Sequence, residues 1–398
     1  MLQALGVLAF VVALLLSVML HEFGHFIFAK KFGMKVTEFF LGFGYKIWSF
    51  TRGETEFGIK AIPAGGYCRI IGMSIHEEMS EEEAPRAFVK ASAPRRLIVL
   101  AAGSISHFIL GFVLLFVIFF GIGVSTTLPI IDQVLPCINT TATSSACTAG
   151  ATVSPAKSAG LMPGDHIISV NGVKVTNWSK DVLVIRNSAG KTVNLEVNRA
   201  GETISISATP AQVTVEGKKY GMLGIISKIG LQREGIITSV HDTWSLGSNF
   251  FSTSIKSLIS LPGKVPALFR QTFLGAKRDA NGLVGVVGVA QASAATASNH
   301  ALSFGDKLET FLLIIASLNI FIGIFNLLPL LPLDGGHMAV AVMDGYRRWS
   351  ARRRSLPEPD PIDLEKLMPI TAVVFIFLVA LSLMLLAADI FNPVHFNL

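Results

Sequence analysis

The chain has 398 residues, of which 51% are hydrophobic and only 15% are charged. Because soluble globular proteins average about 25% charged residues, this deficit excludes an ordinary soluble domain and indicates membrane-spanning segments. A net charge of +6 is also found in nucleic-acid-binding proteins. Here, however, the basic residues stand beside apolar runs, where they set membrane orientation, so no nucleic-acid partner is expected.

Four segments are long and apolar enough to cross a lipid bilayer as helices, which requires about 20 residues each. The first contains no charge between Leu2 and Leu20. It lacks a basic leader and a small-residue cleavage site, so we interpret it as a retained span rather than a signal peptide. The predicted transmembrane helices cover residues 1–30, 97–125, 310–338 and 368–391.

The loops that join these spans predict the topology. Residues 30–96 contain eleven Lys and Arg, and the loop at 339–367 contains six. Since both loops lie on one side of a four-span protein, the positive-inside rule makes that side cytoplasmic. Both termini and the long segment 126–309 are then expected to face outward.

The outward segment is too polar to lie in the bilayer. Its first part, 126–230, is predicted to be a mainly-β domain. The remainder, 231–309, is predicted to be a linker with amphipathic helix over 244–274, interrupted at Pro262-Gly263. Alternating apolar residues and turn dipeptides at Asn171-Gly172 and Ala200-Gly201 predict strands, which cover residues 166–170, 192–197 and 203–207.

The three cysteines divide between the two sides of the predicted membrane. Cys137 and Cys147 both fall in the outward segment, where an oxidising exterior favours a disulfide between them. Cys68 falls on the cytoplasmic side and is expected to be a free thiol.

The candidate catalytic residues begin with an H-E-x-x-H pattern at His21, Glu22 and His25. Residues four apart share one helix face, so both imidazoles can bind one zinc ion, while Glu22 can take a proton from a metal-bound water. Two structural histidines near a helix end are the alternative. The pattern lies about 14 Å inside the basic edge of the first span, where ionisable groups are costly unless they are paired or metal-bound. This depth favours a metal site.

A hydrolytic zinc site needs a third protein ligand, and Asp334 is the obvious donor. Pro329 and Pro332 break the helix before it, and a broken helix at membrane depth is tolerated where it lines a cavity or is buried in protein. The alternative for Asp334 is a helix cap at the membrane edge. His337 could also bind metal, although a surface or supporting role is the stronger expectation.

The sequence HEFGH in the first span, together with PLDGG at 332–336, resembles the site-2 protease family of intramembrane metalloproteases. Residues 42–48, 62–73 and 285–288 resemble three further segments of that family, with Tyr45 in place of a usual proline. The resemblance implies one zinc ion held by His21, His25 and Asp334, with Glu22 as general base.

The second span departs from the family pattern AGPxxN, because Ser104 replaces the proline and His107 the asparagine. A neutral histidine can donate a hydrogen bond to an oxyanion, so His107 could take the role of the asparagine at the reaction centre. Pairing of His107 within the helix bundle is an equally weighted alternative.

Residues 158–172 resemble the GLxxGDxIxxVNG signature of PDZ domains, which bind extended peptides as an added strand. The alternative is a PDZ fold that only restricts access to the protease. The expected fold is therefore an α-helical polytopic membrane protein with four transmembrane helices, a membrane-associated β-hairpin region and an extracytoplasmic PDZ domain.

Four further residues are candidates for substrate binding. Asn319 and Asn326 lie nearly two helical turns apart and face the same way, where they could bind a substrate backbone or another helix. By the family resemblance, Asn326 would hold substrate. A hairpin at 57–72 around Gly65 and Gly66 could insert into the inner leaflet and offer a strand edge to an unwound substrate.

The resemblance implies proteolysis of single-pass membrane proteins in a bacterial cytoplasmic membrane. The expected substrates are anti-sigma factors already trimmed by another protease, and the expected product is a cytoplasmic signalling fragment. Two other readings compete: a non-catalytic scaffold that gathers partners through its PDZ domain, and a metal transporter, which would need polar groups along several spans.

Overall fold

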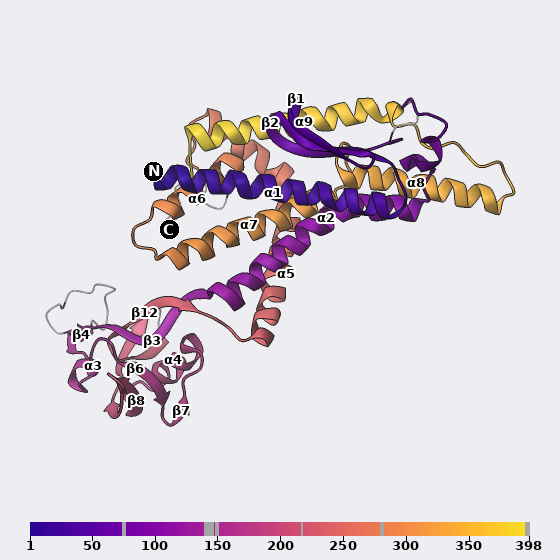
Figure 1. Cartoon of the computed structure of the whole chain (residues 1–398). Helices are drawn as coiled ribbons and strands as arrows, with labels where there is room; N and C mark the ends of the chain where they lie inside the picture. Colours follow the sequence, from indigo (N-terminus) through magenta and orange to yellow (C-terminus); the bar gives the residue numbers. More distant parts are fainter. Residues whose placement is uncertain (74–76, 139–146, 148–150, 216–217, 279–281, 395–398) are drawn as a thin grey trace. The chain divides into compact units, whose positions relative to one another are not determined.

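The computed structural model describes residues 1–73, 77–138, 147, 151–215, 218–278 and 282–394. The chain forms two compact units (Figure 1). The first combines Met1–Gly121 with Glu234–Leu398, and the second is Ile122–Arg233. The second unit interrupts the first in sequence, close to the expected limits of the β-rich domain at 126–230.

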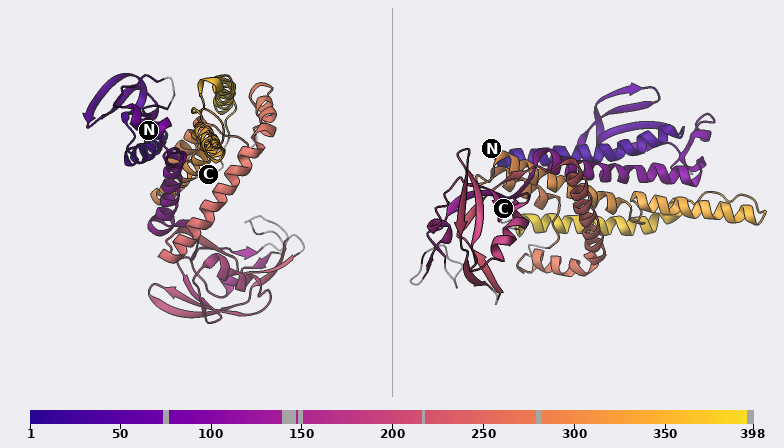
Figure 2. Two further views of the ribbon diagram at one scale, coloured as in Figure 1. Left: turned by 90° about the vertical axis from the view of Figure 1, so that its right-hand side faces the viewer. Right: turned by 90° about the horizontal axis from the view of Figure 1, so that it is seen from below.

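Within the described part of the chain, four helices are long and apolar enough to cross a membrane, as the sequence predicted. They comprise α1 (Leu2–Lys31), α2 (Ala93–Phe116) with its π-helical extension Val117–Ile122, α7 (Phe304–Asn326), and α9 (Met368–Phe391) with the short helix η4 (Glu365–Leu367) before it. In the first unit, α2 packs between α1 and α7 (Figures 1 and 2).

Close approach of α1 to α2 depends on a small residue. A Cβ atom added to Gly24 would lie 2.5 Å from the carbonyl oxygen of Ala102, a distance that no real side chain tolerates. Small residues at helix crossings let backbones approach in this way inside membranes. The crossing places the second half of α1 directly against the first half of α2.

The expected third span at 310–338 is corrected by the structure. Helix α7 ends at Asn326, and a separate helix, α8 (Asp334–Arg353), begins after seven intervening residues. Pro329 and Pro332 lack the N–H groups that a continuous helix requires. Helix α8 then extends through the first half of the basic segment that was expected to be a loop at 339–367.

A small sheet follows α1 in sequence and is built from two long, bent strands, β1 (Val36–Arg52) and β2 (Thr55–Ile70). Residues 38–41 pair on one side with 56–59 and on the other with 66–69. The predicted hairpin with its turn at Gly65-Gly66 is therefore wrong, because the two halves of β2 flank β1 and do not pair with each other. Pro63 cannot donate to a ladder and Gly65 has φ 123, so β2 bends there.

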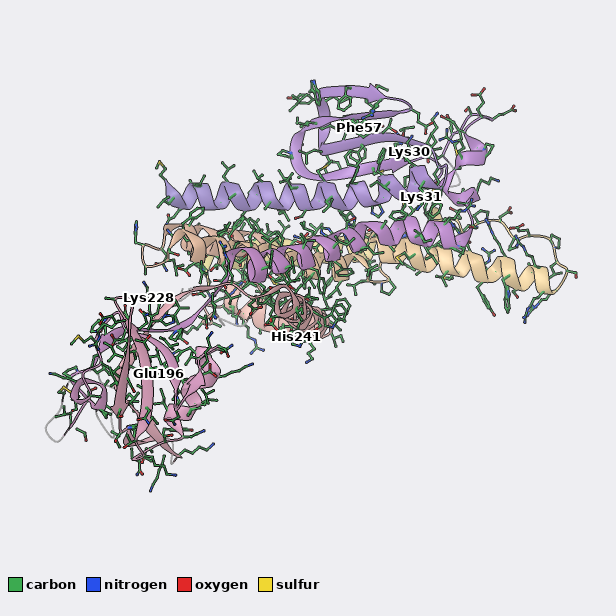
Figure 3. The ribbon with its side chains drawn as sticks, turned by 60° about the horizontal axis from the view of Figure 1, so that its bottom comes forward. Lys30, Lys31, Phe57, Glu196, Lys228 and His241 are labelled. Carbon is green, nitrogen blue, oxygen red and sulfur yellow. A yellow bond between two sulfur atoms is a disulfide. The ribbon has the colours of Figure 1, made fainter. Side chains whose placement is uncertain are left out.

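The true turn between β1 and β2 is attached to the end of α1 by a cluster of charges. Glu54 accepts hydrogen bonds from Lys30 at 2.6 Å and from both terminal nitrogens of Arg86 at 2.7 and 2.6 Å. The Arg86 guanidinium, helped by Lys30, lowers the pKa of Glu54 to about 2. Figure 3 shows Lys30 at the end of α1 and Phe57 on the sheet. The turn is thus held by charge as well as by packing.

The second unit is a sheet with the strand order β12-β3-β6-β8-β9, in which β7 also pairs with β6. Buried apolar side chains, among them Ile131, Ile167, Leu195 and Trp178, form its core. The elements are β3 (Val124–Val134), β4 (Cys137–Ile138), β5 (Thr152–Val153), α3 (Pro155–Ser158), β6 (His166–Val170), β7 (Val173–Lys174), α4 (Trp178–Arg186), β8 (Val193–Arg199), β9 (Glu202–Ala208), β10 (Ala211–Val215), β11 (Lys218–Met222) and β12 (Ile225–Gln232).

Strands β6, β8 and β9 confirm the three strands predicted from alternation, and the residues of the two predicted turns have positive φ angles. Cys137 and Cys147 form the predicted disulfide. Cys68 is a free cysteine, also as predicted.

The helices after the second unit differ from expectation. Helix α5 runs from Ile236 to Phe273 and contains both Pro262 and Pro266, so the predicted interruption at Pro262-Gly263 is wrong. The helix changes direction along its length instead (Figure 2), as prolines bend a helix without ending it when its other hydrogen bonds survive. Helix α6 (Val286–Ser298) follows. Two short 3₁₀ helices, Ala84–Arg86 and Phe88–Lys90, precede α2.

Candidate metal centre

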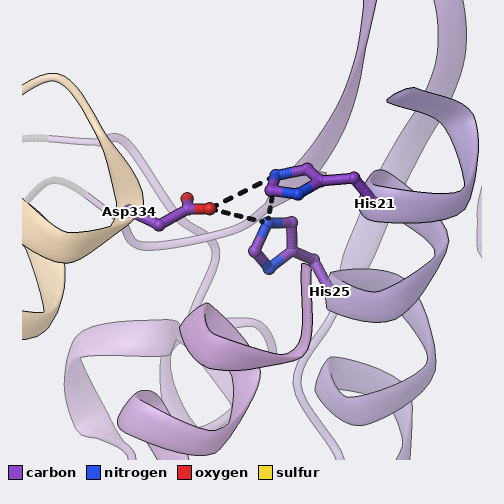
Figure 4. A group of neighbouring side chains, drawn as sticks. All are labelled: His21, His25 and Asp334. Carbon is purple, nitrogen blue, oxygen red and sulfur yellow. Dashed lines mark hydrogen bonds and ion pairs between the residues drawn. The ribbon is translucent and has the colours of Figure 1, made fainter. Parts of the chain in front are cut away.

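Three side chains from two distant parts of the chain meet between α1 and α8 (Figure 4). Nε2 of His21 lies 3.2 Å from Oδ2 of Asp334, and Nε2 of His25 lies 3.4 Å from the same oxygen. The two Nε2 atoms are 3.1 Å apart. The structure therefore brings together the three residues that the sequence proposed as ligands.

Helix α1 fixes the orientation of its two imidazoles in different ways. His21 and His25 are one turn apart, so both rings leave the same face of the helix. Nδ1 of His25 lies 2.8 Å from the carbonyl oxygen of Val99 on α2. Because a carbonyl only accepts, Nδ1 must carry the proton, which leaves the lone pair of Nε2 directed at His21 and Asp334. Hydrogen bonds of this kind orient metal-binding histidines.

Gly103 on α2 provides the space that the two rings occupy. A Cβ atom on this residue would lie 2.5 Å from Nε2 of His25 and 2.6 Å from Cε1 of His21. Even alanine would displace the imidazoles. Sequence reasoning noted this segment only for its departures at Ser104 and His107 and missed the role of Gly103, although a glycine in the middle of a transmembrane helix is a signal of close approach.

Asp334 is the first residue of α8, but it does not cap the helix. The N-cap position is Leu333, and no side-chain cap hydrogen bond is present there. The helix-cap alternative is therefore not supported. A Cβ atom on the following residue, Gly335, would collide with the carbonyl oxygens of Leu327 and Leu328, so the loop folds tightly back on the start of α8. Glycine is needed for that approach.

The arrangement fits a zinc ion by its chemistry. Two imidazole nitrogens and one carboxylate oxygen lie within 4.8 Å of one another, and no other group of this kind occurs among the described residues. Oδ2 of Asp334 is buried and has no hydrogen-bond partner in the part of the chain that the structure describes, although the Nε2 atoms of both rings lie within 3.4 Å of it. Three nitrogen and oxygen ligands with one open position are typical of catalytic zinc.

Glu22 lies next to this group and next to the small sheet. It interacts electrostatically with His21, His25 and Asp334, and with the backbone amide of Cys68 in β2. A Cβ atom on Gly66 would be 3.6 Å from Cγ of Glu22. The carboxylate thus stands between the candidate ligands and the strand 66–70.

His107 and Asn319, both proposed as substrate-binding residues, pair with each other. Nδ1 of His107 lies 2.7 Å from Oδ1 of Asn319, whose amide nitrogen donates to Ser17 and to the Ile315 carbonyl. Since Oδ1 only accepts, the His107 proton is on Nδ1, and Nε2 of the neutral ring has none to donate to an oxyanion. Asn319 is 1% exposed. The contacts favour the helix-packing alternative for both residues.

The other candidates occupy separate places. Asn326 is half-buried at the last position of α7. His337 lines a cavity of about 250 Å³ with Leu331, Pro332, Leu364, Glu365, Met368 and Thr371, outside the metal-binding group. Gly66 lies beside Glu22, while a Cβ atom on Gly65 would contact only the ring of Phe43. Of the two glycines, only Gly66 is at the site.

Comparison with known proteins agrees with this geometry. The sequence pattern described as Peptidase family M50 matches residues 9–356. The zinc metalloprotease Rip1 of Mycobacterium tuberculosis (strain H37Rv) is 32% identical over 404 residues, covering 98% of each chain. Rip1 of Mycolicibacterium smegmatis is 33% identical over 417 residues, covering 99% of each chain. The regulator of sigma-E protease RseP of Salmonella typhimurium is 26% identical over 428 residues, covering 83% of this chain and 88% of the relative.

The four apolar helices, the convergent imidazole and carboxylate groups and these relatives define a membrane-bound zinc metalloprotease. The chain belongs to peptidase family M50, the site-2 protease family. It is a multi-pass protein of the bacterial inner membrane with a zinc cofactor. The family resemblance, the enzyme class and the zinc cofactor predicted from the sequence are thereby confirmed.

Proposed function

We propose that this protein cleaves peptide bonds within transmembrane segments, with His21, His25 and Asp334 as zinc ligands and Glu22 as general base. The observation that carries the proposal is the meeting of the three ligand atoms within 4.8 Å. They come from a transmembrane helix and from the helix that follows the broken third span. A site built in this way acts on substrates within the bilayer.

Held by His21, His25 and Asp334, a zinc ion would lower the pKa of a water ligand to about 7 and would polarise the scissile carbonyl. Glu22 accepts a proton from the attacking water and delivers it to the leaving amide nitrogen. The Val99 carbonyl keeps His25 in the tautomer that leaves Nε2 free. Burial of the site among α1, α2 and α8 strengthens each of these electrostatic interactions.

The strand 66–70 is the proposed docking edge for the substrate. A transmembrane helix uses its own amides internally, so it must unwind before hydrolysis. Residues 66–69 pair on one side with 38–41, and no described strand pairs with their other edge. An extended substrate added there would pass Gly66, which is next to Glu22. The exposed apolar side chains of Tyr45, Ile47 and Trp48 on β1 are consistent with contact between this sheet and the inner leaflet.

We further propose that Ile122–Arg233 is a PDZ domain on the outer side, as the glycine and aspartate positions of residues 158–172 suggest. It would exclude proteins that still carry bulky outer domains and would confine cleavage to substrates already trimmed. Basic residues at both ends of 30–96 and at 347–354 support a cytoplasmic position for those loops and an outward position for both termini. Asn326 remains a candidate contact for substrate.

The relatives suggest a substrate class. One of them is named a regulator of sigma-E protease. By this likeness we propose single-pass membrane proteins, in particular anti-sigma factors, as substrates, with release of a cytoplasmic fragment.

The test is cleavage of a tagged single-span protein, truncated outside, by the purified enzyme in lipid vesicles. We expect Glu22→Gln to retain one zinc ion per chain and to lose cleavage at least about 100-fold, because general base catalysis contributes that much. Full cleavage by this variant would refute the assigned base. Cleavage insensitive to a zinc chelator would refute the metal mechanism as a whole.

A further inference from the structure

A buried ion pair joins α2 to α8 at some distance from the candidate metal centre. Nη1 and Nη2 of Arg96 each lie 3.0 Å from Oδ2 of Asp344. The two side chains are only 3% and 2% exposed. Oδ1 of Asp344 accepts a hydrogen bond from the backbone N–H of Ile362 at 2.8 Å. Both carboxylate oxygens are therefore engaged, and removal of the Asp344 carboxylate would leave the buried charge of Arg96 unpaired.

Each of the two joined helices carries part of the metal centre. Helix α2 holds His25 through the Val99 carbonyl, and its Gly103 contacts both imidazoles. Helix α8 begins with Asp334, which is about 15 Å along the helix from Asp344. A Cβ atom on Gly345 would lie 2.9 Å from Cβ of Ala93, so the two backbones are in close contact beside the ion pair. The pair thus fixes the junction between the two halves of the site.

Helix α8 cannot take its position from the helix before it. Residues 327–333 separate it from α7, and Pro329 and Pro332 prevent helical continuity. The position of α8 is therefore set by its packing, whereas zinc ligands must be placed to within about 0.2 Å. A rigid contact between α8 and α2 supplies that placement.

We infer that Arg96 and Asp344 are positioning residues of the metal centre: their ion pair sets α8 against α2 so that Asp334 meets His21 and His25. The inference rests on the proposed function, because it takes these three residues as the zinc ligands. Arg96 and Asp344 do not themselves touch the zinc site. Their effect is on the affinity of the site for metal.

A second buried ion pair provides a matched control. Nη2 of Arg278 lies 3.0 Å from Oδ1 of Asp389, with side chains 3% and 1% exposed. Asp389 also accepts hydrogen bonds from the backbone amides of Gly285 and Gly288. This pair ties α9 to the start of α6, and neither of these helices carries a candidate zinc ligand. It matches the first pair in chemistry and burial and differs in location.

The experiment compares Asp344→Asn with Asp389→Asn in the full-length protein purified in detergent. Zinc affinity is measured by competition with a chelator of known affinity, and thermal unfolding is measured on the zinc-free protein. We expect both variants to unfold at lower temperature. Only Asp344→Asn should bind zinc about 10–100-fold more weakly, as is typical when a residue that orients metal ligands is lost. Unchanged zinc affinity in Asp344→Asn, or an equal loss in Asp389→Asn, would overturn the inference.

A milder variant covers the case in which Asp344→Asn does not fold. Arg96→Lys keeps the charge but cannot place two nitrogens on one carboxylate oxygen. We expect Arg96→Lys to weaken zinc binding measurably. We expect the double variant Arg96→Lys/Asp344→Asn to bind zinc as tightly as Asp344→Asn alone, because the effects of two coupled residues do not add. Wild-type zinc affinity in Arg96→Lys would contradict the positioning role of the ion pair and would leave the proposed ligand set intact. Failure of the wild-type protein to bind one zinc ion would overturn the proposed ligand set and this inference with it.

Discussion

The two units of this protein place their apolar side chains in opposite ways. In the unit Ile122–Arg233, Leu195 and Ile167 are 0% and 1% exposed and lie in a single apolar core. In the helical unit, Leu16 and Ile376 are 65% and 66% exposed, and none of the most apolar stretch of the α9 span is buried. The difference reflects the solvent around each unit, since lipid accepts apolar surface that water rejects.

Several polar side chains lie inside the helical unit. The interior of the helical unit contains the candidate zinc ligands, the pair formed by His107 and Asn319, and two buried ion pairs. Such groups are costly at membrane depth unless they are paired or bind metal. Burial therefore has a different meaning in each unit. A buried apolar side chain in the second unit indicates a contribution to stability. A buried polar group in the helical unit indicates a role in placing a helix or in chemistry.

The largest effect is expected when a single methyl group is added beside the metal centre in the interior of the helical unit. Gly103→Ala adds a methyl group 2.5 Å from Nε2 of His25. We expect zinc affinity, measured by chelator competition, to fall about 100-fold, because the ligand rings must move. Gly121→Ala on the π-helical extension of α2 is the control, since its Cβ would be 3.9 Å from the nearest atom, on Val117. Wild-type affinity in Gly103→Ala would show that the rings are not where the structure has them.

Much of this centre could be predicted from the sequence, for local reasons. The i, i+4 spacing of His21 and His25 fixes a shared helix face, and the apolar run before them fixes membrane depth. The need for a third zinc ligand and the helix break at Pro329 and Pro332 pointed to Asp334, and the family resemblance agreed. What could not be predicted depends on how helices meet: the tautomer of His25 comes from Val99 on another helix, and Asp334 opens a new helix instead of ending a span.

The same limit explains the errors elsewhere. Gly65-Gly66 has the composition of a turn, yet β1 lies between the two halves of β2, and pairing with β1 decided the outcome. Pro262 has the signature of a helix end, but α5 passes through it. The ion pair between Arg96 and Asp344 joins residues 248 positions apart. Local patterns carry no information on contacts at that separation.

A substitution in the core of the second unit tests whether that core is energetically independent of the metal centre. Leu195→Ala removes a side chain that is 0% exposed, and such changes destabilise a packed core by about 2–5 kcal/mol. We expect faster hydrogen exchange of the amides of β8 and β9 in the full-length protein, with zinc affinity unchanged. Leu183→Ala, at a position 48% exposed, should leave exchange unaltered. A loss of zinc affinity in Leu195→Ala would show that the two units are energetically coupled.

The smallest expected effect concerns the charges that attach the turn of the small sheet to α1. The pKa of Glu54, lowered to about 2 by the Arg86 guanidinium and Lys30, lies below its ordinary value of about 4.3. A group with a lowered folded pKa stabilises the protein above its ordinary pKa, and the stabilisation is lost as the pH falls towards the folded value. Partial exposure of the three side chains and screening by water limit the effect to about 1 kcal/mol or less per pair.

Glu54→Gln should therefore lower the unfolding temperature of the full-length protein slightly at pH 6, and its difference from the wild type should shrink steadily from pH 5 to pH 2. Glu82→Gln, a change of the same charge at an exposed position in the same loop region, is the control and should not reproduce this pH dependence. A difference between Glu54→Gln and wild type that stays constant down to pH 2 would mean that the cluster acts through shape and not charge. The sheet beside Glu22 would then be held to α1 by packing alone, as the core of the second unit is.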